Sequence, residues 1–153
     1  MPSTTTFALP YPALSSAPNV PQDLQLLAAA IDLLLTPVLT TTTASIGTVS
    51  SGFTVNDVRA ITLLGGRLIF LDLYLSNTAA ITVTSGNMTD TTVFTLVSAL
   101  WPSHYTSFVW GNGSVGGEGN VISTSGEVSL RAASDSIAAG TNIRISTAYL
   151  RNP

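Results

Sequence analysis

The chain has 153 residues, and its hydrophobic content of 45% is enough for one packed domain with a small appendage. The absence of cysteine excludes disulfide bonds, thiolate zinc sites and a cysteine nucleophile. The formal net charge is −3 and no lysine is present, so we do not expect a nucleic-acid-binding surface, which requires clustered cations. The sequence shows neither a secretory signal nor an apolar stretch long enough to span a membrane, so membrane insertion is not expected.

Residues 1–18 are rich in proline and predict an extended connecting arm. Apolar residues interrupt the arm, and such residues usually need another surface to lie against. We therefore expect the arm to dock on a partner protein or on a neighbouring copy of the chain. These apolar residues are Phe7, Leu9, Tyr11 and Leu14.

A coiled-coil-like helical segment is predicted in residues 19–38, with the helix itself running to about Thr36. It begins near Asn19 or Val20, with Pro21 in the first turn and Asp23 where the helix dipole favours an anion. Its apolar residues recur every three or four positions, which is the spacing of a coiled-coil seam. An amphipathic helix packed on its own domain also explains this spacing. The expected oligomerisation residues are Leu24, Leu27, Ile31, Leu34 and Val38.

Further apolar residues widen this stripe beyond a narrow two-stranded seam and favour three helices, so we expect a homotrimer. These flanking residues are Ala28, Ala29 and Leu35. A helix this short is marginal in water by itself, so a larger domain must oligomerise with it.

Residues 39–51 are rich in Thr, Ser and Gly and predict a linker, with a poorly determined first strand as the alternative, and residues 52–153 predict a β-sheet head. In the head, Gly, Asn and Ser recur between short β-rich stretches, a pattern typical of an antiparallel, jelly-roll-like β-sandwich. Two such stretches, 55–64 and 67–75, flank Gly65-Gly66 and predict a hairpin. Further strands are expected at 80–84, 91–96, 107–110, 120–123, 127–132 and 142–150.

The second strand of this hairpin is apolar on both faces. Ile69, Leu71, Leu73 and Leu75 share one face, while Leu68, Phe70 and Tyr74 share the other. Both faces are expected to be covered, the second of them by a neighbouring subunit or by a loop.

Residues with the chemistry of a catalytic or metal site are sparse. His104 is the one histidine, and its expected place is an exposed loop, so no metal or cofactor is predicted. The eight acidic residues are scattered and show no spacing of a catalytic pair, so the protein is not expected to be an enzyme. The stretch 111–119 predicts a glycine-rich hairpin loop, because no helix or Lys-Ser/Thr pair follows to bind phosphate.

The best candidate for a ligand surface is a group of aromatic and polar residues, because aromatic rings stack on sugars while amides and hydroxyls bind sugar hydroxyl groups. The alternative is that the two tryptophans belong to the core. The candidate ligand-binding residues are Trp101, His104, Tyr105, Trp110 and Asn112.

Several stretches together resemble the carboxy-terminal heads of bacteriophage tail fibres and minor tail (receptor-binding) proteins, especially those of phages that infect actinobacteria. They are residues 20–28, residues 86–96 followed by Trp101-Pro102-Ser103, and residues 126–130 with 137–146 and 148–150. Val97 stands where the family often has proline. The resemblance implies a homotrimeric virion component assembled in the host cytoplasm, which joins other tail or baseplate proteins through its arm.

The leading hypothesis is a receptor-binding head that attaches to a bacterial cell-surface glycan as part of a phage tail or a related injection particle. A rival hypothesis is a purely structural trimer, such as a fibre cap or a capsid decoration protein. A third is an enzyme that degrades host polysaccharide, which the scattered acidic residues disfavour.

Overall fold

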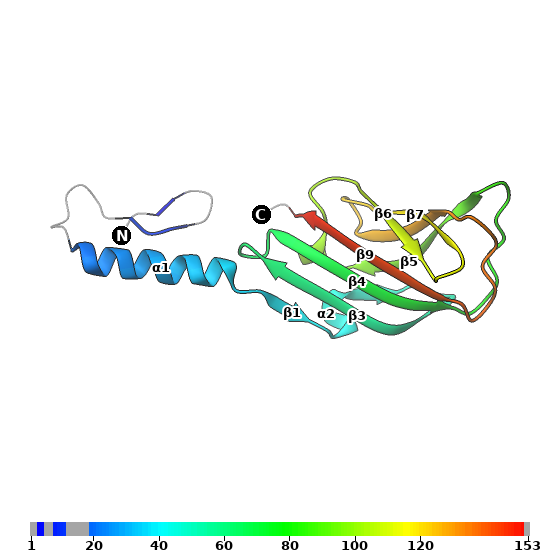
Figure 1. The fold of residues 1–153 in the computed structure, drawn as a ribbon, viewed down its shortest axis with the longest axis horizontal. Coiled ribbons are helices and arrows are strands. Elements are labelled where there is room, and N and C mark those ends of the chain that lie inside the picture. Colours follow the sequence, from blue (N-terminus) through cyan, green and yellow to red (C-terminus); the bar gives the residue numbers. More distant parts are fainter. Residues whose placement is uncertain (1–2, 5–7, 12–18, 152–153) are drawn as a thin grey trace.

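The computed structural model of the chain describes residues 3–4, 8–11 and 19–151. A helix projects from one end of a head made of antiparallel strands, and strands account for 51% of the chain (Figure 1). The predicted mainly β architecture with one short helix is therefore confirmed. In chain order the elements are α1 (Val20–Leu35), β1 (Val38–Thr40), α2 (Thr43–Ile46), β2 (Gly47–Val49), β3 (Phe53–Leu63), β4 (Leu68–Asn77), β5 (Asn87–Leu96), the 3-10 turn η1 (Ser98–Leu100), β6 (Thr106–Gly111), β7 (Gly116–Val121), β8 (Glu127–Ala132) and β9 (Asn142–Leu150).

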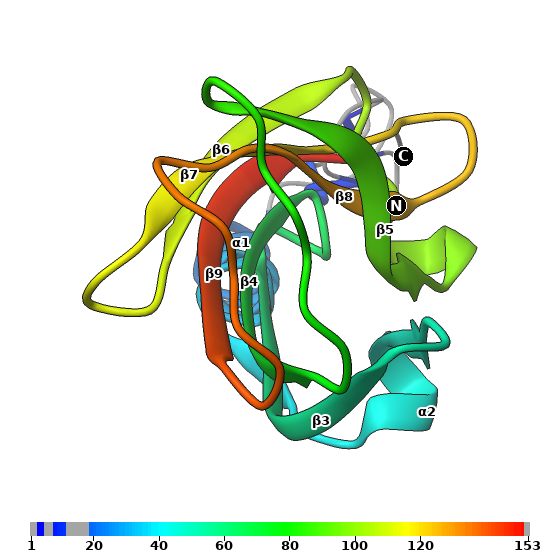
Figure 2. The same cartoon turned by 90° about the vertical axis from the view of Figure 1, so that its right-hand side faces the viewer.

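All nine strands belong to one antiparallel sheet with the order β1-β3-β4-β9-β6-β7-β8-β5-β2. The sheet curls around the core, so that its two halves face each other when the head is viewed end-on (Figure 2). The short helix α2 lies between the ends of the curl, because it contacts β3 while β2, which follows it directly, pairs with β5. A sandwich of two separate sheets is not confirmed.

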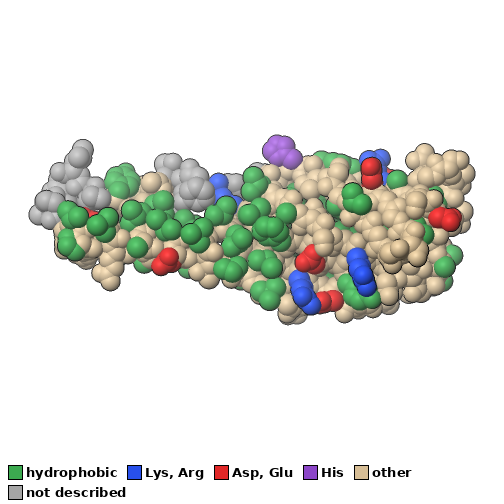
Figure 3. Space-filling model, viewed as in Figure 1, with side chains coloured by type: hydrophobic (Ala, Val, Ile, Leu, Met, Phe, Trp, Pro, Cys, Tyr) green, Lys and Arg blue, Asp and Glu red, His purple; other side chains and the backbone are tan. Residues whose placement is uncertain are grey.

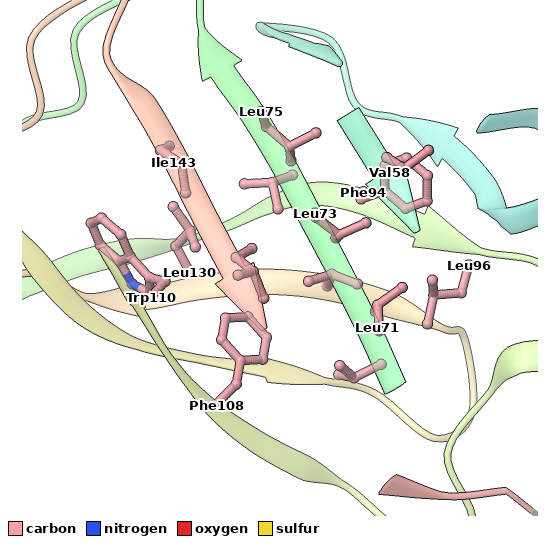
Figure 4. Close-up of a cluster of buried hydrophobic side chains, with 14 of the residues drawn as sticks. Val58, Leu71, Leu73, Leu75, Phe94, Leu96, Phe108, Trp110, Leu130 and Ile143 are labelled. Carbon is pink, nitrogen blue, oxygen red and sulfur yellow. The ribbon is translucent and has the colours of Figure 1, made fainter. Parts of the chain in front are cut away.

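The core fills the inside of this curl. Alternate residues of β4 point inward, and Ile69, Leu71, Leu73 and Leu75, which were predicted to share one face, are all buried. Figure 4 shows side chains of β4 in one cluster with residues of the opposite half of the sheet, among them Phe94.

The predicted hairpin is confirmed as β3 and β4, with Leu63 paired to Leu68. Its connection places Leu64, Gly65 and Gly66 at φ values of 54°, 64° and 84°. Glycine adopts this left-handed region without a steric penalty, which explains the two adjacent glycines.

Helix α1 begins and ends close to the predicted residues. The Asn19 side chain caps it by accepting from the Gln22 backbone N–H, and the Asn19 amide donates to the Gln22 side chain at 2.8 Å. The helix ends at Leu35, because the residue before Pro37 is disfavoured from helical geometry. Val38, predicted to be the last residue of the seam, instead begins β1.

Residues 39–51 do not form the predicted linker, because they contribute most of β1, all of α2 and all of β2 to the head. Two other predictions are corrected in the same way. Residues 80–84 form isolated bridges rather than a strand, and the supposed glycine-rich loop is shorter because β7 already begins at Gly116.

The glycines of β7 meet a packing requirement that sequence patterns do not reveal. A Cβ atom at Gly117 would overlap the backbone carbonyl of Ala132, and one at Gly119 would overlap the ring of Phe108. These glycines therefore allow β7 to approach β8 and the core closely.

Candidate functional site

The described part of the arm lies beside α1. Ser3 pairs with Pro10, and Pro10 and Tyr11 line a small cavity together with Val20 and Leu24 of the helix. This part of the arm thus folds back on itself and is not fully extended. Phe7 and Leu14, two of the apolar residues expected to dock on a partner, lie outside the described residues.

Helix α1 contacts the head only at its C-terminal end, and none of its residues is buried. Leu33 is 77% exposed and Leu24 is 60% exposed, while Leu27 and Leu34 of the predicted seam are half-buried. Leu34 reaches the β3–β4 hairpin, where its carbonyl accepts from the Leu64 N–H at 2.9 Å. The predicted packing of the helix on its own domain is therefore limited to this end.

Exposed apolar side chains continue from the helix onto the head. On the outer face of the sheet, Leu39, Ile61, Phe70 and Ala148 stand in register across β1, β3, β4 and β9. Phe70 is 41% exposed, so the outer face of β4 is not covered by a loop of the described chain. Figure 3 shows hydrophobic side chains running along α1 and onto the adjoining part of the head. We call α1 and this apolar end of the sheet the assembly surface.

A charged band adjoins the assembly surface on the same outer face. Asp57 forms an ion pair with Arg59 at 2.8 Å, and the Ser146 hydroxyl donates to Asp72. The Arg144 guanidinium lies 5.2 Å from the centre of the Tyr74 ring, within the range of a cation–π contact. Figure 3 shows acidic and basic side chains gathered beyond the apolar end. The outer face therefore changes from apolar to charged with distance from the helix.

The two tryptophans proposed to bind ligand are engaged with the core. Trp110 is 2% exposed, and its Nε1–H donates to the carbonyls of Glu118 and Ala132 at 3.2 Å. Trp101 is half-buried against the core and donates to the Leu96 carbonyl at 2.9 Å. The alternative that the tryptophans are core residues describes Trp110 fully and Trp101 in part.

The other three candidates remain near the surface but do not form one site. His104 is exposed and its Nδ1 lies 3.1 Å from the Ser103 hydroxyl. Asn112 stabilises the β6–β7 turn, where its side-chain oxygen accepts from the backbone N–H groups of Ser114 and Val115 at 2.8 and 2.7 Å. Tyr105 is 51% exposed and contacts different residues from these two.

Tyr105 borders a polar cleft of about 320 Å³ on the outer face of β5, β6, β7 and β8, which we call the Tyr105 cleft. Its volume lies at the lower end of the range for small-ligand sites, roughly 300–1,000 Å³. The cleft is lined by Asn87, Met88, Asp90, Tyr105, Ser107, Glu118, Gly119, Arg131 and Ala132.

Sequence reasoning found only Tyr105 of this cleft. Asp90, Glu118 and Arg131 lie on three different strands, and no local spacing marks them as neighbours. The one available signal was Arg131, a charged residue on the strand predicted at 127–132 in a chain with only 8% charged residues. Asp90 lay before the strand predicted at 91–96, and Glu118 lay in the predicted loop.

In the part of the chain that the structure describes, no group of three or more His, Cys, Asp or Glu side chains is arranged to hold a metal ion. None of the described helices is both long and apolar enough to cross a membrane. No protein-family model matches the chain, and no curated protein matches it either.

Proposed function

We propose that the protein is the homotrimeric head of a fibre-like particle, a phage tail or a related injection particle, and that it attaches this particle to a bacterial surface glycan. The observation that carries the proposal is the leucine-rich helix α1, which buries none of its residues within the described chain. The resemblance of the sequence to tail-fibre heads supports the same conclusion.

The helix requires a partner for a physical reason. An isolated helix of 16 residues is marginally stable in water, and its leucines would expose a large apolar surface there. Burying each exposed leucine against another chain contributes roughly 1.5–3 kcal/mol. Because the apolar end of the sheet continues this surface, association of the helices also brings the heads together.

The distribution of polar residues on α1 supports three chains rather than two. With about 100° of rotation per residue, Gln22, Gln25 and Asp32 fall within roughly 80° of one another. Asp23 stands apart in the first turn, about 100° from Gln22, and leucines and alanines occupy most of the remaining circumference. A broad apolar arc is what a helix with two neighbours needs, since each neighbour covers a separate part of it.

In this proposal the curled sheet acts as a sandwich-like head, whose two halves are held together by one core. It presents a surface rich in hydroxyl and amide groups and poor in charge, which suits recognition of a neutral polymer. Three copies would combine weak contacts into stable attachment. The described part of the arm, which lies beside α1, is the proposed link to other tail or baseplate proteins.

Light scattering on the purified chain tests the assembly. We expect a mass three times the 15.8 kDa of one chain at micromolar concentration. The double variant Leu24→Ser and Ile31→Ser removes two apolar residues of the helix and should give monomers. The matched control, Gln25→Ser with Asp32→Ser, changes the polar side of the same helix and should remain trimeric. A monomeric unmodified chain contradicts the proposal.

Adhesion to cells tests the attachment role separately. The labelled trimer should sediment with intact cells of at least one strain in a panel of actinobacteria, and the monomeric variant should do so far more weakly because avidity is lost. A trimer that adheres to no strain contradicts receptor binding and supports the rival function of a structural cap.

A further inference from the structure

A row of polar residues in register begins at Ser107, in the wall of the Tyr105 cleft, and continues beside the cleft. Ser107 pairs with Asn120, Asn120 with Ser129, and Ser129 with Thr92, so the row crosses β6, β7, β8 and β5. These residues alternate with core residues and therefore lie on the outward face of the sheet. Asn120 is nevertheless only 3% exposed, because other side chains cover it.

Tyr105 is fixed over this row by two hydrogen bonds. Its hydroxyl accepts from the Asn120 amide and from Arg131 Nη1, the latter at 3.1 Å. The ring remains half exposed. A ring that is held at its hydroxyl and open on a face is preorganised for stacking, because little side-chain freedom is lost when a ligand binds.

Charged groups surround the ring. Arg131 Nε donates to Asp90 at 3.1 Å, and this hydrogen bond, followed by the one to Tyr105, raises the pKa of the Arg131 guanidinium above its ordinary value. Asp90 and Glu118 are both exposed, and the Glu118 carboxylate has no ion pair among the described residues. The cleft thus offers carboxylate acceptors, guanidinium donors and an aromatic face within one space.

We propose that the Tyr105 cleft binds a neutral saccharide, an inference that rests on the proposed attachment function and identifies its ligand class and site. A pyranose or furanose ring presents an apolar C–H face to Tyr105 and hydroxyl groups at its edge. The carboxylates of Asp90 and Glu118 accept from such hydroxyls, and the free N–H groups of Arg131 donate to their oxygens.

The charge balance favours a neutral sugar over an anionic one. Two carboxylates face the cleft, whereas the single guanidinium already pairs with Asp90. A phosphate- or carboxylate-bearing polymer would meet net negative charge there, and its binding would be opposed.

Affinity electrophoresis of the full chain through gels containing dextran, mannan, galactan or arabinan tests this inference, with polygalacturonate as the anionic comparison. We expect at least one neutral polymer to retard the protein and polygalacturonate to leave its mobility unchanged. Tyr105→Ala and the double variant Asp90→Asn with Glu118→Gln should each weaken retardation by roughly tenfold in apparent Kd. Tyr105→Phe, which keeps the ring, should weaken it less than Tyr105→Ala.

Tyr74→Ala is the matched control. Tyr74 also stands beside an arginine, Arg144, but these two residues lie on β4 and β9, outside the Tyr105 cleft. It should bind the polymer as the unmodified chain does, and all variants should stay trimeric by light scattering. Retardation by none of the neutral polymers, preference for polygalacturonate, or equal binding by Tyr105→Ala each overturns the inference. If Tyr105→Ala still adheres to cells as strongly as the unmodified trimer, the cleft is not the attachment site although the proposed function stands.

Discussion

Helix α1 and strand β4 have similar compositions and opposite surroundings. Both are dominated by leucine and isoleucine, yet β4 buries four such residues inside the head whereas α1 buries none. The difference arises from geometry. Strand β4 pairs with neighbours on both sides, which places its inward residues in the centre of the curl, while α1 projects from the end of the head (Figure 1).

The apolar pattern of each element identifies a surface that favours burial, but it does not identify what covers that surface. The period of two in β4 is satisfied within one chain. The spacing of three and four in α1 is not matched by burial among the described residues, and in the proposed trimer the helices of the other chains cover it.

The largest expected effect separates the two leucine-rich regions directly. Leu71→Ala removes a fully buried side chain and leaves a cavity, so the free energy of unfolding should fall by about 2–5 kcal/mol. Leu33→Ala changes a side chain that is 77% exposed and should alter head stability by less than about 0.5 kcal/mol. Urea denaturation followed by tryptophan fluorescence measures both, since Trp101 and Trp110 lie in the head.

Equal losses from the two variants would show that α1 is packed as tightly as the core. Such a result, obtained below the concentration at which the chains associate, would contradict a structure in which α1 buries none of its residues. A loss for Leu33→Ala that appears only at concentrations where trimers form would instead place Leu33 in the contact between chains.

The sequence predicted those features of the fold that depend on a local pattern of residues. The period of two along residues 67–75 predicted which residues share a face, although both faces were expected to be covered. Gly65-Gly66 predicted the hairpin, and Asn19 with Pro21 predicted the helix start. In each case the determining interactions lie within a few residues in sequence or repeat with the period of the element. The sequence pattern can therefore be recognised without knowledge of the fold.

The remaining features depend on contacts between distant residues. The positions of α2 and β2 at the ends of the curl depend on how the whole sheet curls, which no local pattern reveals. Residues 39–51 have a Thr-rich composition that is also typical of a linker. The Tyr105 cleft joins β5, β7 and β8 across the sheet. Trp101 was a candidate ligand-binding residue, but its indole reaches back to the Leu96 carbonyl and packs against the core.

A smaller effect is expected from the glycines of β7, which were mistaken for a loop. Gly117→Ala places a Cβ atom into the Ala132 carbonyl, and because backbone must move, stability should fall by about 1–3 kcal/mol. Gly111→Ala is the matched control, since its Cβ would lie 3.6 Å from the nearest atom, the Val115 carbonyl oxygen. Thermal unfolding of the two variants checks the difference. If Gly117→Ala and Gly111→Ala have the same melting temperature, β7 does not approach β8 as closely as described.

The smallest expected effect at neutral pH concerns a hydroxyl group buried in the head. Tyr149 is largely buried and donates to the Leu100 carbonyl at 2.7 Å, and burial raises the pKa of its phenol above the ordinary value. Tyr149→Phe removes this hydrogen bond and should cost about 1 kcal/mol at pH 8.

The same hydroxyl should make the head sensitive to alkali while the helix is not. The unfolded phenol ionises near pH 10, and the folded phenol stays protonated to a higher pH because its pKa is raised. Above about pH 10 the unfolded state therefore binds fewer protons than the folded state, and stability falls as the pH rises toward the folded pKa. Tyr149→Phe should lose less stability than the unmodified chain between pH 8 and pH 11, whereas Tyr74→Phe, which keeps Tyr149, should retain the full loss. Near-ultraviolet circular dichroism of the tryptophans follows the head during this titration. An identical alkaline loss in Tyr149→Phe would mean that other groups of the head set the pH dependence.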